Sequence, residues 1–206
     1  ALIENNKPEN RVYLYKHFSD NCATRIRDQL EKAAGGKLKY DTLSDKPYTY
    51  RQLLDQCLPG NSWSGFGIKL ALGIPCDRRT TFSQKMFLPP YLEADMAKAL
   101  IVRDDGNGPF AQPVKILYKA PVIHEGFNLT SPAMVVLTFL TVVLGLSIWE
   151  YKLKRRWIWL DFIVYFSFGI AGLILGFLCF FSILEATGWN LNLIWALPTH
   201  FIYAFV

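Results

Sequence analysis

The sequence predicts an α+β soluble domain over residues 1–130, followed by an α-helical transmembrane region over residues 131–206. Charged side chains occur every few positions as far as Thr130, as in an ordinary globular domain. Residues 131–149 and 162–184 then contain no charged side chain, and a helix needs roughly 20 apolar residues to cross a bilayer. The sequence therefore predicts an integral membrane protein.

A third hydrophobic run begins near residue 193 and reaches Val206. At about 1.5 Å per residue, this run is too short to span a bilayer as a helix. We therefore expect its helix to continue beyond this sequence. Near Ala1, no basic segment precedes an apolar one, so no signal peptide is expected there. We expect the soluble domain to be incomplete at its N-terminus as well.

The loop between the first two spans indicates how the chain is oriented. Lys152, Lys154, Arg155 and Arg156 lie in this short loop, and such basic loops mark the cytoplasmic side. The soluble domain then lies on the opposite side of the membrane, which in a bacterium is the periplasm. The loop over residues 185–192 is expected on the periplasmic side too.

Turn residues and apolar periodicity outline the soluble domain. A helix from three successive N-cap candidates, Ser19, Asp20 and Asn21, to about Ala34 is the clearest element, because two glycines follow it. The other expected elements are a strand or extended segment over 11–18, a helix from 45 or 46 through 54, a helix over 91–101, a turn at 104–108 and a strand over 115–122.

Cys22 lies at the expected start of this first helix. The free N–H groups and the positive dipole end of a helix start stabilise a thiolate, which is the nucleophilic form of cysteine. Arg25 and Arg27 add positive charge within a turn. However, Cys22, Ile26 and Leu30 have helical spacing, which places Cys22 on the buried face. An activated nucleophile and a packing residue are both compatible with this position.

Two further cysteines, Cys57 and Cys76, belong to the same soluble stretch. A periplasmic location permits a disulfide between them, and we treat this bridge as possible. Cys179 lies inside the second span and is most simply an apolar packing residue.

Four stretches of the sequence carry motifs of a known family. The most specific is YLYKHFSDNCATRIRD at residues 13–28, and the others are FGI and LGIPCDR at 66–78, MFLP at 86–89 and WNLNLIWALP at 189–198. Together these motifs resemble the Lnb family of Bacteroidota membrane proteins, and the resemblance covers most of the chain. It implies a papain-like, permuted NlpC-type α+β domain, joined to several transmembrane helices in the bacterial inner membrane.

The resemblance also implies a chemistry. Lnb proteins are lipoprotein N-acyltransferases, so Cys22 would take an acyl chain from a membrane phospholipid as a thioester. The chain would then pass to the α-amino group of a diacylated lipoprotein's N-terminal cysteine. The partners are thus a phospholipid donor and a lipoprotein acceptor, with no cofactor.

A cysteine nucleophile needs a base within hydrogen-bond reach. The sequence contains three histidines, His17, His124 and His200. In the family that this chain resembles, the catalytic histidine precedes the cysteine in a Gly-His strand, which this sequence lacks. We therefore expect the histidine partner of Cys22 to lie outside these 206 residues, and we read His17 as a surface or packing residue.

Seven polar residues are candidate substrate contacts: Asn21 and Arg25 beside the cysteine, Asp77 and Arg78, and Glu185, Asn190 and Asn192 after the second span. A surface ion pair at a turn explains Asp77 and Arg78 equally well. Interfacial capping explains the last three nearly as well as contact with a lipid headgroup or an amine. The sequence offers no metal-spaced Cys/His cluster, no Gly-rich phosphate loop and no basic nucleic-acid stripe.

Two other functions remain compatible with the sequence. One is a membrane-anchored papain-like amidase or peptidase that acts on cell-wall material. The other is a non-catalytic membrane scaffold in which Cys22 is a core residue. The stretch 118–129 and the loop 185–192 are where a lipid substrate would be expected to enter an acyltransferase.

Overall fold

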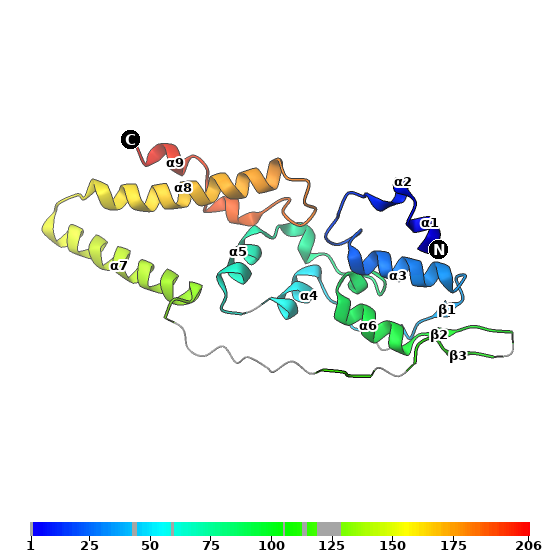
Figure 1. The fold of residues 1–206 in the computed structure, drawn as a ribbon. Helices are drawn as coiled ribbons and strands as arrows, with labels where there is room; N and C mark the ends of the chain where they lie inside the picture. Colours follow the sequence, from blue (N-terminus) through cyan, green and yellow to red (C-terminus); the bar gives the residue numbers. More distant parts are fainter. Residues whose placement is uncertain (1, 43–44, 59, 105, 113–114, 119–128) are drawn as a thin grey trace. The chain divides into compact units, whose positions relative to one another are not determined.

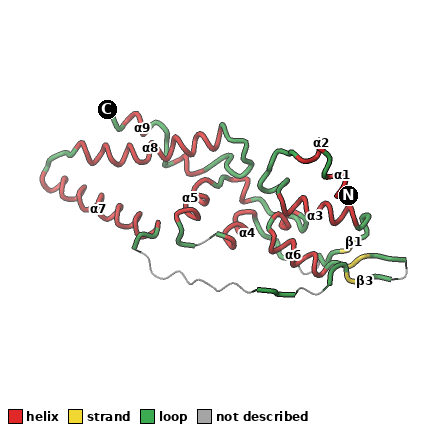
Figure 2. Tube along the Cα trace, in the orientation of Figure 1, coloured by secondary structure: helices red, strands yellow, loops and turns green. Residues whose placement is uncertain are grey.

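The computed structural model describes residues 2–206, apart from 43–44, 59, 105, 113–114 and 119–128. Its elements run along the chain in the order shown in Figures 1 and 2. They are α1 (Leu2–Asn5), α2 (Pro8–Arg11), α3 (Cys22–Ala33), β1 (Leu38–Lys39), α4 (Tyr50–Cys57), α5 (Trp63–Ala71), η1 (Ile74–Asp77), η2 (Gln84–Phe87), α6 (Pro89–Lys98), β2 (Leu100–Ile101), β3 (Gly108–Pro109), α7 (Pro132–Leu153), α8 (Ile158–Phe180), η3 (Leu191–Ile194) and α9 (His200–Tyr203).

These elements form two compact units that interrupt one another in the sequence. The first unit contains the described residues through Leu54 and those from Asp77 to Tyr118. The second contains residues 55–76 together with the described residues from Leu129 onward. The composition changes near residue 130, but the segment 55–76 folds with the hydrophobic C-terminal part.

The first unit is helix-rich and carries a small antiparallel sheet in the order β1-β2-β3, with Leu38 opposite Ile101 and Ile101 opposite Gly108. Its core is a cluster of Ala23 from α3, Met86 from η2, and Leu92 and Met96 from α6. Partly buried apolar side chains surround the cluster, among them Leu30, Leu38, Tyr40, Phe82 and Phe110. Burial of this apolar surface holds α3, α6 and the sheet together.

One lysine inside the first unit is paired with two acids. Lys85 is buried, and its Nζ lies 2.5 Å from Asp45 Oδ1 and 3.2 Å from Asp95 Oδ2. Its ammonium group also lies 4.2 Å from the centre of the Phe82 ring. A buried charge is tolerated when it is paired in this way, so Lys85 has a structural role.

The structure confirms the expected helix after Asn21, and Gly35 and Gly36 end it with positive φ angles of 64° and 74°. Two other helices differ in their boundaries. The helix expected from 45 or 46 begins at Tyr50, after Pro47 rather than around it. The helix expected over 91–101 begins at Pro89, because proline is well accommodated in the first turn.

Two segments were expected to be extended. Residues 12–15 are extended and lead to an isolated bridge between Lys16 and Asp20, so the first of these segments forms no regular strand. Residues 115–118 are not a strand either, and the rest of the stretch 115–122 lies outside the described residues.

The second unit contains α7 and α8, joined through residues 154–157 (Figure 1). Among the described residues, these are the two helices long and apolar enough to cross a membrane. The third hydrophobic run forms the short helices η3 and α9 instead of one long helix, and Pro198 lies between them. Proline lacks the N–H that a continuous helix would use at this position.

Candidate functional site

The start of α3 is fixed by a reciprocal cap. Asn21 Oδ1 accepts a 2.9 Å hydrogen bond from the Thr24 N–H, and the Asn21 N–H donates to Thr24 Oγ1 at 2.8 Å. Asn21 Nδ2 also donates to the carbonyl oxygens of His17, at 3.0 Å, and Phe87, at 2.9 Å. The side chain of Asn21 is buried and its polar groups are occupied. Its structural position is that of a cap, with no polar group turned toward solvent for a substrate.

Cys22 is the first residue of α3 and is exposed. The expectation that it lies on the buried face is wrong. Ala23 and Thr24 are the buried residues of α3, and Ile26 is exposed beside Cys22. The physical reason is the cap, in which Asn21 and Thr24 are buried in the first unit. Neighbouring helical residues point about 100° apart, so Cys22 projects outward when the cap and Ala23 are buried.

Cys22 lines an apolar groove of about 340 Å³. One wall comes from α3 and the other from α6; the lining side chains are Cys22, Ala23, Ile26, Leu30, Pro89, Leu92, Glu93 and Met96. Besides the thiol, Glu93 is the one titratable side chain among them. The groove could hold an apolar chain attached to Cys22.

Arg25 lies one turn after Cys22 but is engaged elsewhere. Its guanidinium donates to both carboxylate oxygens of Asp20, at 2.6 and 2.9 Å, and lies 3.6 Å from the centre of the Tyr13 ring. This pairing lowers the pKa of Asp20 below its usual value. Arg25 therefore links α3 to the segment that precedes the cap, through Asp20 and Tyr13, and this role is structural.

His17 is exposed at the surface, and its ring contacts two aromatic neighbours. Its ring makes edge contacts with Phe18 and Phe87, at centroid distances of 5.2 and 5.9 Å. Desolvation by these neighbours lowers the pKa of His17 below its usual value. An imidazole held in this way remains neutral more readily than a free one.

Two residues near Cys22, Tyr15 and Glu93, were not among the candidate site residues predicted from the sequence. Tyr15 is half exposed, and partial burial, followed by an electrostatic effect of Cys22, raises its pKa. Tyr15 belongs to the motif at residues 13–28, so the motif could have identified it as a candidate site residue. No sequence pattern identifies Glu93, because only the packing of α6 against α3 brings it to the groove.

Asp77 and Arg78 form no pair with each other. Asp77 instead pairs with Arg51, at 2.6 and 3.2 Å, and this contact lowers the pKa of Asp77. Arg78 is exposed, and its carbonyl accepts from the Tyr50 N–H at 3.4 Å. Asp77 thus takes part in a surface ion pair, the simpler of the two expected roles, although with Arg51 as its partner.

The polar residues after α8 also have structural partners. Asn190 and Asn192 each donate an amide N–H to the Leu70 carbonyl, at 2.8 and 2.9 Å, at the end of α5. Glu185 is exposed in the same loop. His200 begins α9 with its ring 5.6 Å from that of Tyr165. His124 lies outside the described residues.

The possible disulfide between Cys57 and Cys76 is not formed. Both are free thiols: Cys57 is exposed, and Cys76 is fully buried in the second unit, where its Sγ donates to the Ala186 carbonyl at 3.3 Å. A thiol that is buried and hydrogen-bonded in this way is satisfied without oxidation.

Comparison with protein families gives two matches. Residues 2–56 match the Lnb N-terminal periplasmic domain, and residues 124–206 match the Lnb transmembrane domain. No curated protein and no solved structure matches the chain. The two matches confirm a membrane protein with a periplasmic part, as the basic loop after the first span predicted. On these matches, which lie on either side of an unmatched middle segment, the chain belongs to the Lnb family.

Proposed function

We propose that this chain is the acyl-transferring part of a lipoprotein N-acyltransferase of the bacterial inner membrane, with Cys22 as nucleophile. Family membership supports a role in lipoprotein N-acylation. The observation that carries the proposal is the exposed thiol of Cys22 in the lining of an apolar groove. Its soluble part would have the permuted papain-like fold, and α7 and α8 would cross the membrane as two of several spans.

In the first step, the Cys22 sulfur attacks the ester carbonyl carbon of a phospholipid, and its proton passes to a base. The carbon–oxygen ester bond breaks, the departing alcohol takes up a proton, and a thioester remains on Cys22. The N–H groups in the first turn of a helix have no partner within the helix, so that of Cys22 is available to stabilise the tetrahedral oxyanion.

In the second step, the neutral α-amino group of a diacylated lipoprotein attacks the thioester carbonyl. The carbon–sulfur bond breaks, an amide bond forms, and the amine's proton returns Cys22 to the thiol. We infer that the base in both steps is a histidine other than His17, because the catalytic histidine of this family lies in a Gly-His segment and His17 follows Lys16.

An amidase or peptidase that acts on cell-wall material is the second candidate. Such a substrate is a polar polymer and needs hydrogen-bonding groups along its binding site. The groove beside Cys22 is lined mostly by apolar side chains from α3 and α6. Apolar lining favours an alkyl chain, because its burial releases water from both surfaces.

The test is to replace Cys22 with serine in cells that depend on this protein, and to analyse lipoprotein N-termini by mass spectrometry. We expect N-acylation to be lost in Cys22→Ser and retained in the matched control Cys57→Ser, which alters another exposed cysteine. Unchanged N-acylation in Cys22→Ser would overturn the proposal. Loss of cell-wall cleavage with intact N-acylation would favour the amidase.

A further inference from the structure

The segment formed by α5 and η1 is hydrogen-bonded to the chain just before α7 and to the loop that follows α8. At the start of α5, the Trp63 indole Nε1 donates to the carbonyl of Thr130, which lies two residues before α7, at 2.9 Å. At its end, Leu70 O accepts from both asparagine amides of the loop that follows α8. The segment thus connects two points that lie at the same side of the membrane.

Backbone contacts strengthen the second attachment. The Gly73 N–H donates to the Ala186 carbonyl at 2.8 Å, and the Ile74 N–H donates to the Trp189 carbonyl at 3.3 Å. A Cβ atom on Gly73 would lie 1.8 Å from the Gly188 oxygen, so only glycine allows this approach. These contacts hold the end of α5 and the start of η1 against the loop that follows α8, which ends at Phe180.

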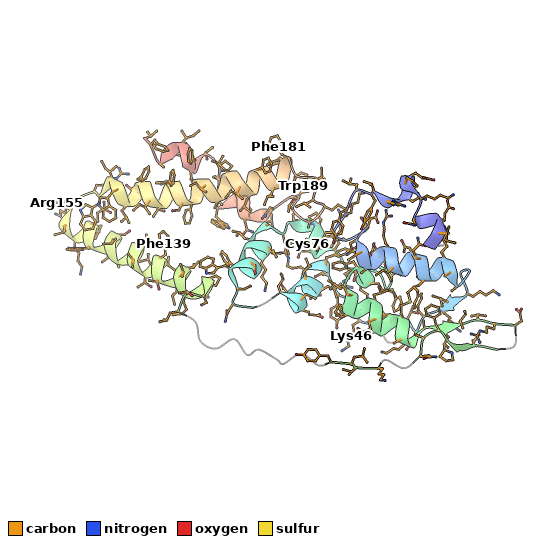
Figure 3. All side chains as sticks on the ribbon, in the orientation of Figure 1. Lys46, Cys76, Phe139, Arg155, Phe181 and Trp189 are labelled. Carbon is orange, nitrogen blue, oxygen red and sulfur yellow. The ribbon has the colours of Figure 1, made fainter. Side chains whose placement is uncertain are left out.

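One exposed side of α5 is aromatic. Trp63 and Phe66 are 53% and 40% exposed, project about 60° apart around the helix axis, and have rings 6.1 Å apart in an edge contact. The one charged side chain of α5, Lys69, pairs with Asp55 at 3.2 Å. Phe181 and Trp189, labelled in Figure 3, add exposed aromatic surface to the loop after α8.

An apolar helix face of this kind is unfavourable in water, whereas aromatic side chains are enriched at the membrane–water interface. We propose that α5 and η1 form an interfacial anchor that lies in the periplasmic leaflet. Trp63 and Phe66 enter the boundary between headgroups and acyl chains. The partner is the phospholipid bilayer itself, because the segment is hydrogen-bonded to the chain just before α7 and to the loop that follows α8. This inference does not depend on the chemistry of Cys22.

The test uses single spin labels on the full chain, reconstituted in vesicles of phosphatidylethanolamine and phosphatidylglycerol. The label is placed at Phe66→Cys, in a background with Cys22→Ser, Cys57→Ser and Cys179→Ala, in which the remaining Cys76 is fully buried. Collision rates are then measured with oxygen, which concentrates in the bilayer, and with a water-soluble nickel complex. Lys32→Cys on α3 provides the aqueous reference, and Leu144→Cys within α7 provides the hydrocarbon reference.

We expect the Phe66 label to favour oxygen over nickel at least several-fold more than the Lys32 label, at a shallower depth than the Leu144 label. A ratio equal to that at Lys32 would place the face in water and overturn the proposal. Protection from both reagents would show that another protein surface covers the face, which also overturns it. The unlabelled chain gives a second readout: quenching by lipids with brominated acyl chains should decrease when Trp63 is replaced by phenylalanine.

Discussion

At the level of single residues, Cys22 is exposed because its neighbours on both sides are buried. Asn21 is anchored by hydrogen bonds to two carbonyl groups, and Ala23 packs into the core cluster. The sequence predicted the cap and the helix start correctly, since those signals are local. It could not predict the direction of the thiol, because that depends on Phe87, which is 66 positions away from Asn21.

Ile26 provides a test of the groove beside Cys22. Its side chain is exposed, so Ile26→Asp should leave the free energy of unfolding nearly unchanged. Loss of an apolar contact worth about 1.5–3 kcal/mol should lower kcat/KM for acyl transfer by roughly 10- to 100-fold. The assay is N-acylation of a diacylated lipopeptide in vesicles. Val12→Asp, which alters an exposed residue outside the groove, is the control and should retain full activity.

At the level of elements, glycines in α8 allow the short helices that follow it to pack closely against it. A Cβ atom on Gly172 would lie 2.4 Å from the Ala196 oxygen, and one on Gly169 would lie 2.3 Å from the Phe201 nitrogen. Small residues allow such close backbone approach between packed membrane segments. The run from residue 193 therefore packs against α8 as η3 and α9.

Gly172→Ala should disrupt this packing. The contacted atoms belong to the backbone of residues 196–198, so they cannot move aside as a flexible side chain would. We expect a loss of about 1–3 kcal/mol in stability, measured as earlier unfolding with rising denaturant in detergent. Gly145→Ala in α7 is the matched control, because its Cβ would meet nothing within 4 Å. Equal stability of the two variants would contradict the packing of η3 and α9 on α8.

Comparing elements shows which features the sequence can reveal. The two long helices were predictable, because a charge-free run of that length has few alternatives in a soluble protein. The roles of Asn190 and Asn192 were not predictable, since their partner Leu70 is 120 or more positions away. Likewise, Asp77 has Arg51 as its partner because η1 and α4 are brought together by folding. Polar residues near a membrane can serve the structure as readily as a substrate.

At the level of the whole molecule, the membrane has more than one role in the proposed function. The transmembrane helices anchor the chain, and the apolar face of α5 offers a further contact with the periplasmic leaflet. In the proposed acyl transfer, the same bilayer supplies the acyl chain that Cys22 receives. The long hydrophobic helices would then keep the enzyme in contact with its donor substrate.

The most direct test of this central claim is to detect the acyl group on Cys22 itself. The full-length protein is incubated with phospholipid vesicles in the absence of a lipoprotein acceptor, and the peptide containing Cys22 is analysed by mass spectrometry. We predict a mass increase of one acyl chain on Cys22 that neutral hydroxylamine removes, and that disappears when a diacylated lipopeptide is added. A Cys22 peptide that stays unmodified under these conditions, while the lipopeptide is still N-acylated, would contradict the thioester mechanism.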